Sequence, residues 1–164
     1  GARKIYSLED LSIAFEKDKN LIVQEYMGDA LDLDADVYID TVSHEVVSIF
    51  TKKKLETRIG GASKTVSFID EKLVDFLIDA LKHFSFNGPI DVDVFCRDGK
   101  YYLSEVNPRF GGAYLHAFGA GVDFIHMIQN NIKGIKNKPE FMQYEEGIAM
   151  LMYDSVVIRK LNNE

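Results

Sequence analysis

The sequence predicts a single globular α+β domain. Its 164 residues, 46% hydrophobic and 27% charged, have the size and composition of one domain with a substantial core. Residues 31–40 alternate apolar and polar side chains almost perfectly, as half-buried strands do. The apolar residues of 70–84 recur at helical spacing instead. Because both periods occur in one short chain, we expect strands and helices to share one core.

The first half of the chain is expected to hold one helix, three strands and a loop. Ser7 is placed to cap a helix that begins at Leu8. Residues 21–27 are predicted to form a strand. Residues 31–40 and 46–54 flank a short polar turn and should pair as an antiparallel hairpin. Residues 57–64, which include Gly60 and Gly61, are expected to form a loop.

The second half begins with the most clearly patterned helix, residues 70–84, which Asn87 and Gly88 end. Residues 90–95 and 101–106 should form a second hairpin around residues 97–100. A short helix is expected near residues 113–118 and a longer one near 122–132. A last strand is predicted over residues 148–158.

Composition excludes several classes of function. The net charge of −7 argues against a general nucleic-acid binder. No apolar run approaches the length of a membrane span, and the first residues show no secretory pattern. The one cysteine, Cys96, cannot form an internal disulfide and fits a reducing cytoplasm. We therefore expect a cytoplasmic protein that binds neither nucleic acid nor membrane, and we assign Cys96 no catalytic role.

The most informative stretch places Glu105, Asn107 and Arg109 at alternate positions of one extended segment. Alternate side chains of a strand share a face. Carboxylate and amide oxygens suit Mg²⁺, and a guanidinium suits phosphate oxygens. Pro108 has no N–H for a sheet ladder, and the glycines at 111 and 112 allow a sharp turn close to a ligand. The alternative is a surface strand that ends in a turn.

The register of the second hairpin decides whether Asp91 and Asp93 join this group. A two-residue turn would pair Val92 with Glu105 and send the aspartates to the opposite face. A three-residue loop or a bulge would pair Asp93 with Glu105 and Asp91 with Asn107. The metal hypothesis predicts this second register. The alternative is an acidic face in contact with solvent.

Two further groups precede this hairpin. The main chain of residues 24–28, Gln-Glu-Tyr-Met-Gly, could read the edge of a planar base. Asp32, Asp34, Asp36 and Asp40 share a strand face; a calcium loop is rejected because Val37 replaces the required glycine. One of these aspartates could accept hydrogen bonds from ribose hydroxyls, and the others are expected to be solvated.

A basic group surrounds the Gly60-Gly61 pair and suits a phosphate or a carboxylate substrate. A solvated run of charge is the alternative for each lysine, and Arg58 is the best functional candidate. His116 is the histidine nearest the proposed site, and we expect it to pack in a helix. The basic group comprises Lys52, Lys53, Lys54, Arg58, Ser63 and Lys64.

The order of these segments along the chain resembles the ATP-grasp superfamily. The segments are, in order, the Gln-Glu-Tyr-Met-Gly run, the acidic strand, the basic Gly-Gly segment, Gly-Pro-Ile-Asp-Val-Asp and Glu-Val-Asn-Pro-Arg-Phe-Gly-Gly. The resemblance is strongest to the branch of the carbamoyl-phosphate synthase large subunit. It implies antiparallel sheets flanked by helices, incomplete at the N-terminus. Residues 1–64 would form the nucleotide-lid and adenine side, and residues 65–164 the metal and phosphate side.

The resemblance also implies roles for individual residues. The main chain of Glu25, Tyr26 and Met27 would contact adenine, Asp32 would bind ribose where the family usually has Glu, and Lys54 would bind the nucleotide. The metal ligands would be Asp93, where Gln or Glu is common, with Glu105 and Asn107. Arg109 and Arg58 would face phosphate or the acyl-phosphate intermediate.

The implied activity is an ATP-dependent ligase that uses Mg²⁺ or Mn²⁺. ATP would phosphorylate a small carboxylate, and an amine or another nucleophile would then displace phosphate. A nucleotide-binding lysine and a flexible loop usually precede the segment that begins here, so the chain is expected to be a portion of a larger enzyme and inactive alone. The alternatives are a nucleotide-binding module without ligase activity and an acidic α+β interaction domain.

Overall fold

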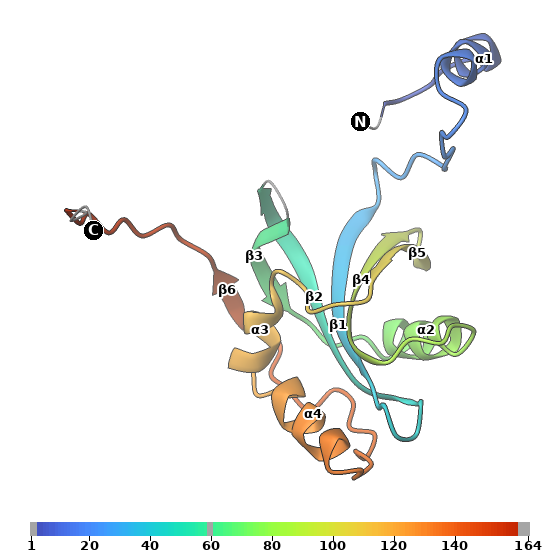
Figure 1. The fold of residues 1–164 in the computed structure, drawn as a ribbon. Coiled ribbons are helices and arrows are strands. Elements are labelled where there is room, and N and C mark those ends of the chain that lie inside the picture. The colour runs from blue at the N-terminus through green and yellow to red at the C-terminus, as the bar shows by residue number, and fades with distance from the viewer. Residues whose placement is uncertain (1–2, 59–60, 161–164) are drawn as a thin grey trace. The chain divides into compact units, whose positions relative to one another are not determined.

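A computed structural model describes residues 3–58 and 61–160 of the chain (Figure 1). It separates into two compact units, Gly1–Ala30 and Leu31–Glu164. The sheet and most helices belong to the second unit. Each unit is described by itself below.

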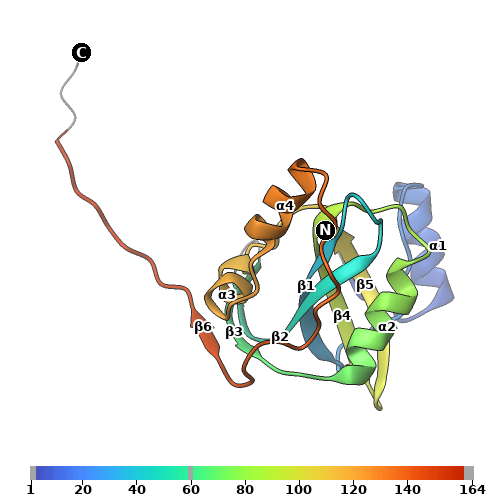
Figure 2. The same ribbon diagram turned by 90° about the horizontal axis from the view of Figure 1, so that it is seen from below.

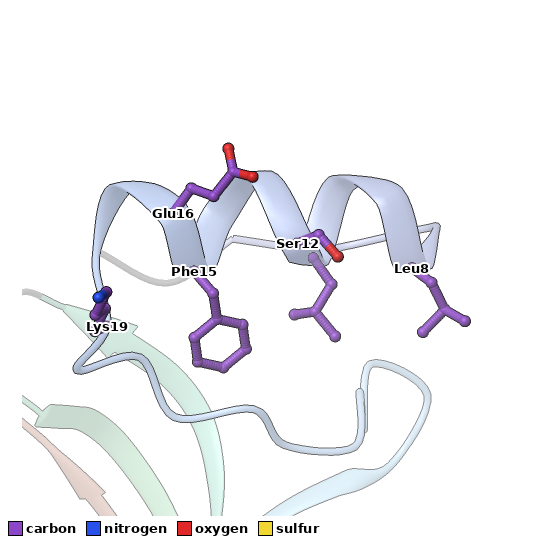
Figure 3. Close-up of a pocket in the computed structure, with 6 residues that line it drawn as sticks. Leu8, Ser12, Phe15, Glu16 and Lys19 are labelled. Atoms are coloured by element: carbon purple, nitrogen blue, oxygen red, sulfur yellow. The ribbon is translucent and has the colours of Figure 1, made fainter.

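The first unit contains one helix, α1 (Leu8–Lys17). The Ser7 hydroxyl accepts a hydrogen bond from the backbone N–H of Asp10 at 3.1 Å, which confirms the predicted cap. Figure 3 shows Leu8 and Phe15 projecting from the same side of this helix. The strand predicted over residues 21–27 is wrong. This apolar run pairs with no other strand among the described residues, and an apolar sequence alone does not supply the hydrogen bonds that a strand requires.

The second unit is built on one six-stranded antiparallel sheet with the order β5-β4-β1-β2-β3-β6. Both predicted hairpins are present. The strands are β1 (Leu31–Ile39), β2 (Val46–Arg58), β3 (Gly61–Ser67), β4 (Gly88–Arg97), β5 (Lys100–Asn107) and β6 (Ala149–Leu151).

Two predicted boundaries in this sheet are wrong. The loop expected over residues 57–64 is largely strand, because β2 continues to Arg58 and β3 begins at Gly61; Gly60 lies outside the described residues. The strand expected over residues 148–158 is only three residues long. It pairs with Lys64–Val66 of β3, and the chain beyond it runs past the ladder with exposed side chains.

One face of the sheet is covered by α2 (Glu71–Leu81), the predicted helix with slightly shorter bounds (Figure 2). The Asp70 side chain caps it by accepting from the N–H of Leu73 at 3.2 Å. Alternation along β1 explains the packing, because Leu33, Ala35, Val37 and Ile39 all point to this side. The helix contributes the buried residues Leu73, Val74, Leu77 and Leu81 to the same cluster.

The opposite face carries a second cluster beneath α3 (Tyr114–Gly119) and α4 (Phe124–Ile132). Tyr38 of β1 and Phe50 of β2 are fully buried there, and Phe50 packs against Tyr144 with ring centroids 4.6 Å apart. Tyr38 is the β1 residue two positions beyond Asp36, so the same strand face is aromatic at one end and acidic at the other. No helix in the described ranges is both long and apolar enough to span a bilayer.

Candidate functional site

The register of the β4–β5 hairpin is the one that the metal hypothesis predicts. The turn itself has two residues, Asp98 and Gly99, both with positive φ, as a type I′ turn requires. Val94 then pairs with Leu103, but the next pair is Asp93 with Glu105. Ser104 is therefore the extra residue of a β-bulge. The bulge brings Glu105 and Asn107 opposite Asp93 and Asp91, and turns Val106 to the α2 side of the sheet.

Pairing between β1 and β4 extends this polar face across the sheet. Asp34 lies opposite Asp93, and Asp36 lies opposite Asp91. On the other side of β1, Asp34 also pairs with Lys52 of β2. Two rows of oxygen-bearing side chains thus cross three strands: Glu105, Asp93 and Asp34 in one row, and Asn107, Asp91 and Asp36 in the other. We call these six residues the acidic rows.

Lys52 is the buried cation of this face. Its Nζ lies 3.0 Å from Asp34 Oδ1 and donates a hydrogen bond to Asp36 Oδ2, and the lysine side chain has no solvent exposure. Burial alone would lower the pKa of Lys52, but the two carboxylates outweigh it and raise that pKa. Burial, reinforced by the neighbouring Asp34, raises the pKa of Asp36 despite the lysine. The expectation that Asp34 and Asp36 are solvated is wrong.

Lys54 contacts two residues for which the family resemblance implies separate roles. Its Nζ lies 2.9 Å from Asp32 Oδ1 and 2.5 Å from Asp93 Oδ1. Burial alone would lower the pKa of Lys54, but the hydrogen bonds and charges of Asp93 and Asp32 outweigh it and raise that pKa well above its usual value. One ion cluster thus contains Asp32, Lys54 and Asp93, which were expected to bind ribose, nucleotide and metal, respectively. The Lys54 side chain in this cluster is 13% exposed.

Asp91 lies close to Arg109 and Gly111. Asp91 is buried, and burial together with the charge of Asp34 raises its pKa to about 7. Arg109 Nη1 lies 3.6 Å from Asp91 Oδ2 and donates to the Phe110 carbonyl at 2.9 Å. A Cβ on Gly111 would lie 2.6 Å from Asp91 Oδ1 and 2.8 Å from Asp36 Oδ1, so only glycine allows this close approach.

A cavity of about 310 Å³ opens over these residues. Five of the predicted site residues line it: Lys54, Asp93, Glu105, Asn107 and Arg109. Asp34 and Asp91 line it as well. Its lining consists of Asp34, Lys54, Thr57, Gly61, Ala62, Asp91, Asp93, Glu105, Asn107, Arg109, Gly112 and Ala113.

The donor set fits a hard cation in part. In the described part of the chain, no three His, Cys, Asp or Glu side chains already form a metal site. Lys54 engages Asp93, and a Mg²⁺ site commonly completes its shell with phosphate oxygens and water. The side chains proposed as ligands, Asp93, Glu105 and Asn107, all line the cavity and can offer oxygen atoms. The residues therefore suit a cation that arrives with a phosphate ligand.

Asp32 and Arg58 do not line this cavity, and the other three predicted residues are not part of the sheet. Arg58 is 52% exposed, and its guanidinium contacts Asp154 Oδ2 at 3.2 Å and Glu56 Oε1 at 3.3 Å. The other three, Glu25, Tyr26 and Met27, belong to the first unit, where Lys4 Nζ lies 3.6 Å from the centroid of the Tyr26 ring. Their contact with adenine stays a prediction, as does the role of Arg58.

Two polar residues near the sheet have structural roles. His116 is buried, with Nδ1 bonded to the Thr65 hydroxyl at 2.7 Å and Nε2 to the Ile148 carbonyl at 2.9 Å, which confirms its packed position. Asp40 is also buried, although a solvated side chain was expected. It accepts hydrogen bonds from the N–H groups of Val42 and Ser43 and from Asn131 and Asn137.

The sequence identified the acidic strand and the Asp91-Val92-Asp93 pair but gave Lys52, Asp36 and Asp91 no role of their own. The pairing of β1 with both β2 and β4 unites these three residues. The usable signal was the period-two spacing of the acidic residues in 32–36, followed by a lysine on the partner strand.

The arrangement of sheet and helices is the predicted ATP-grasp-type fold. It is similar to N5-carboxyaminoimidazole synthetase from Staphylococcus aureus in complex with ADP, with a TM-score of 0.65 and 16% identity over 88% of this chain and 41% of that one. It is also similar to a biotin carboxylase–β,γ-ATP complex from Campylobacter jejuni, with a TM-score of 0.58 and 16% identity over 77% of this chain and 30% of the other.

A third similar structure is an L-amino acid ligase from Bacillus licheniformis, with a TM-score of 0.56 and 18% identity. The match covers 82% of this chain and 36% of the ligase. This chain thus spans about two fifths or less of these three solved proteins. No protein-family model and no curated protein sequence matches the chain.

Proposed function

We propose that this chain supplies the metal and phosphate side of the nucleotide site in an ATP-dependent carboxylate–amine ligase, similar to carbamoyl-phosphate synthase. The observation that carries the proposal is the register in which Asp93 faces Glu105 and Asp91 faces Asn107 beside Lys54 and Arg109. An interaction domain with merely superficial carboxylates has no reason to bury Asp34, Asp36 and Asp91. The fold shared with solved ligases is consistent with the proposal.

In this proposal Asp93, Glu105 and Asn107 would hold Mg²⁺ or Mn²⁺, and the bound ion would supply positive charge for the ATP phosphates. Lys54 leaves Asp93 and donates to a phosphate oxygen, and Asp32, released from the same lysine, accepts from a ribose hydroxyl. Arg109 is 59% exposed at the cavity and can turn its free donors toward the transferring phosphoryl group. Arg58 remains a predicted phosphate ligand.

The chain's part in the reaction is positioning and charge stabilisation. An oxygen of the carboxylate substrate attacks the γ-phosphorus of ATP, and the bond to the ADP oxygen breaks. The amine then attacks the carbonyl carbon of the acyl-phosphate, inorganic phosphate leaves, and the nitrogen loses a proton. No side-chain nucleophile is needed, which agrees with a buried His116 whose two ring nitrogens are already bonded.

Phosphate release by the full-length protein tests the proposal. Pairs of amino acids and small carboxylates with amines should release phosphate from ATP in a Mg²⁺-dependent way. Glu105→Gln should lower kcat/KM by at least about 100-fold, because one metal carboxylate is lost. Glu45→Gln removes one exposed carboxylate from a turn and should have no effect. ATP binding without phosphate release for any pair would favour the nucleotide-binding module instead.

A further inference from the structure

Two lysines face the acidic rows, and their surroundings differ. Lys54 lies near the end of β2, at the cavity, and its side chain is 13% exposed. Lys52 lies two residues earlier on the same strand face, with no exposure, and does not line the cavity. A lysine at the cavity can move to solvent or to a phosphate when a ligand enters. Lys52 has no such path, so its charge is a permanent part of the site.

The carboxylates around Lys52 would otherwise form a cation site. Asp34 and Asp36 both contact its Nζ, and Asp91 lies directly opposite Asp36 in the ladder. Asp34 Oδ1 has the Lys52 ammonium as its partner, and the buried Asp36 Oδ1 accepts no hydrogen bond in the described residues. Without the lysine, Asp34 and Asp36 would present carboxylate oxygens to one position beside Asp91, and such oxygens are the ligands that a divalent cation prefers. The lysine ammonium occupies this position.

We propose that Lys52 acts as an internal cation that withdraws Asp34 and Asp36 from metal binding and confines divalent ions to the β4–β5 edge. Lys52 is therefore a positioning residue for the acidic rows, because it fixes Asp36 and Asp34 through its own contacts. The metal at the β4–β5 edge rests on the proposed function. The role of Lys52 as an internal cation does not rest on the proposed function, because its test is what Asp34 and Asp36 bind when the lysine is removed.

The test is the number of Mn²⁺ ions bound by the chain, measured by electron paramagnetic resonance of free Mn²⁺ at neutral pH. Lys52→Met should bind one Mn²⁺ more than the unmodified chain. Lys52→Arg keeps the positive charge and should restore the original number. Lys52→Met combined with Asp36→Asn should lose the additional ion. A folded Lys52→Met variant that binds no additional Mn²⁺ would overturn the proposal.

Removal of a buried cation can prevent folding, so a second pair of variants keeps Lys52. Asp34→Asn and Asp36→Asn should bind Mn²⁺ within about threefold of the unmodified chain, whereas Glu105→Gln should weaken binding at least tenfold. A tenfold loss in either aspartate variant would show that these carboxylates are metal ligands and would refute the role of Lys52. If the unmodified chain binds no Mn²⁺ even with ATP present, the metal of the proposed function fails, while the gain in Lys52→Met still tests the internal cation.

Discussion

Substitution of Asp40 is predicted to lower the free energy of unfolding. The carboxylate is fully buried at the end of β1 and accepts five hydrogen bonds. Oδ1 accepts from the N–H groups of Val42 and Ser43, at 2.9 and 2.8 Å. Oδ2 accepts from Asn131 Nδ2 at 2.7 Å and from the N–H and Nδ2 of Asn137, both at 2.8 Å. Asp40 thereby fixes the β1–β2 turn against the end of α4 and the segment that follows it.

Asp40→Asn keeps the shape of this side chain but turns an amide nitrogen toward three donors. Two of those donors have second acceptors, because Asn131 Nδ2 also bonds the Ile135 carbonyl and Asn137 Nδ2 also bonds the Met127 carbonyl, each at 3.0 Å. Only the Asn137 N–H loses its sole acceptor among those described. With hydrogen bonds to charged groups worth about 1.5–3 kcal/mol, we expect a loss of about 2–4 kcal/mol in the free energy of unfolding. This corresponds to a Tm lower by roughly 5–15 °C.

Urea denaturation of the chain at two pH values is the assay. Burial alone would raise the pKa of Asp40, but hydrogen bonds from Asn131, Asn137 and Ser43 outweigh it and hold that pKa well below its ordinary value. The stabilisation is therefore complete above the unfolded pKa of about 3.9 and is lost as pH falls toward the folded pKa. The difference between Asp40→Asn and the unmodified chain should shrink accordingly below about pH 4. Asp98→Asn, in an exposed turn with positive φ, is the control and should be neutral. An Asp40→Asn effect below about 0.5 kcal/mol, or one that does not change with pH, would refute the reasoning.

Two further predictions concern the backbone of the site. Gly111→Ala should destabilise the fold by about 1–3 kcal/mol and weaken Mn²⁺ binding, because its Cβ would meet Asp91 and Asp36, whereas Gly119→Ala meets no atom within 4 Å and should be neutral or slightly stabilising. Equal effects of the two substitutions on Tm would contradict the close approach at Gly111. Deletion of Ser104 removes only the bulge, so the Asp93–Glu105 pair and Mn²⁺ binding should persist, whereas deletion of Val106 should move Asn107 to the α2 side of the sheet and abolish binding. Loss of Mn²⁺ binding on deletion of Ser104 in a folded protein would show that the bulge itself shapes the site.

Much of the fold follows from local periodicity. The alternation of residues 31–40 specifies β1 because it sends Leu33 and Val37 to one face and Asp34 and Asp36 to the other. Residues 21–27 do not form the expected strand, because hydrophobicity alone does not identify a pairing partner. Glycines suggest a loop over residues 57–64, but the long ladder between β2 and β3 extends β2 to Arg58 and starts β3 at Gly61, while Gly60 lies outside the described residues.

The candidate site was predictable where the chemistry lies within one hairpin. Whether Glu105 and Asn107 share a face with Asp93 depends only on the register of the β4–β5 hairpin. The bulge at Ser104 produces the register in which they do. Lys52 could not be distinguished from its neighbours Lys53 and Lys54 by local sequence, since the run Lys-Lys-Lys alternates between the two faces of β2. Its burial depends on Asp34 and Asp36, which lie on another strand.

Calorimetric titration of ATP into the chain, with and without Mg²⁺, tests the central claim most directly. We predict that Mg²⁺ tightens ATP binding at least tenfold and that Glu105→Gln abolishes this gain, while Glu45→Gln retains it. A Glu105→Gln variant that binds ATP with the same Mg²⁺ dependence as the unmodified chain would contradict a metal–nucleotide site between β4 and β5.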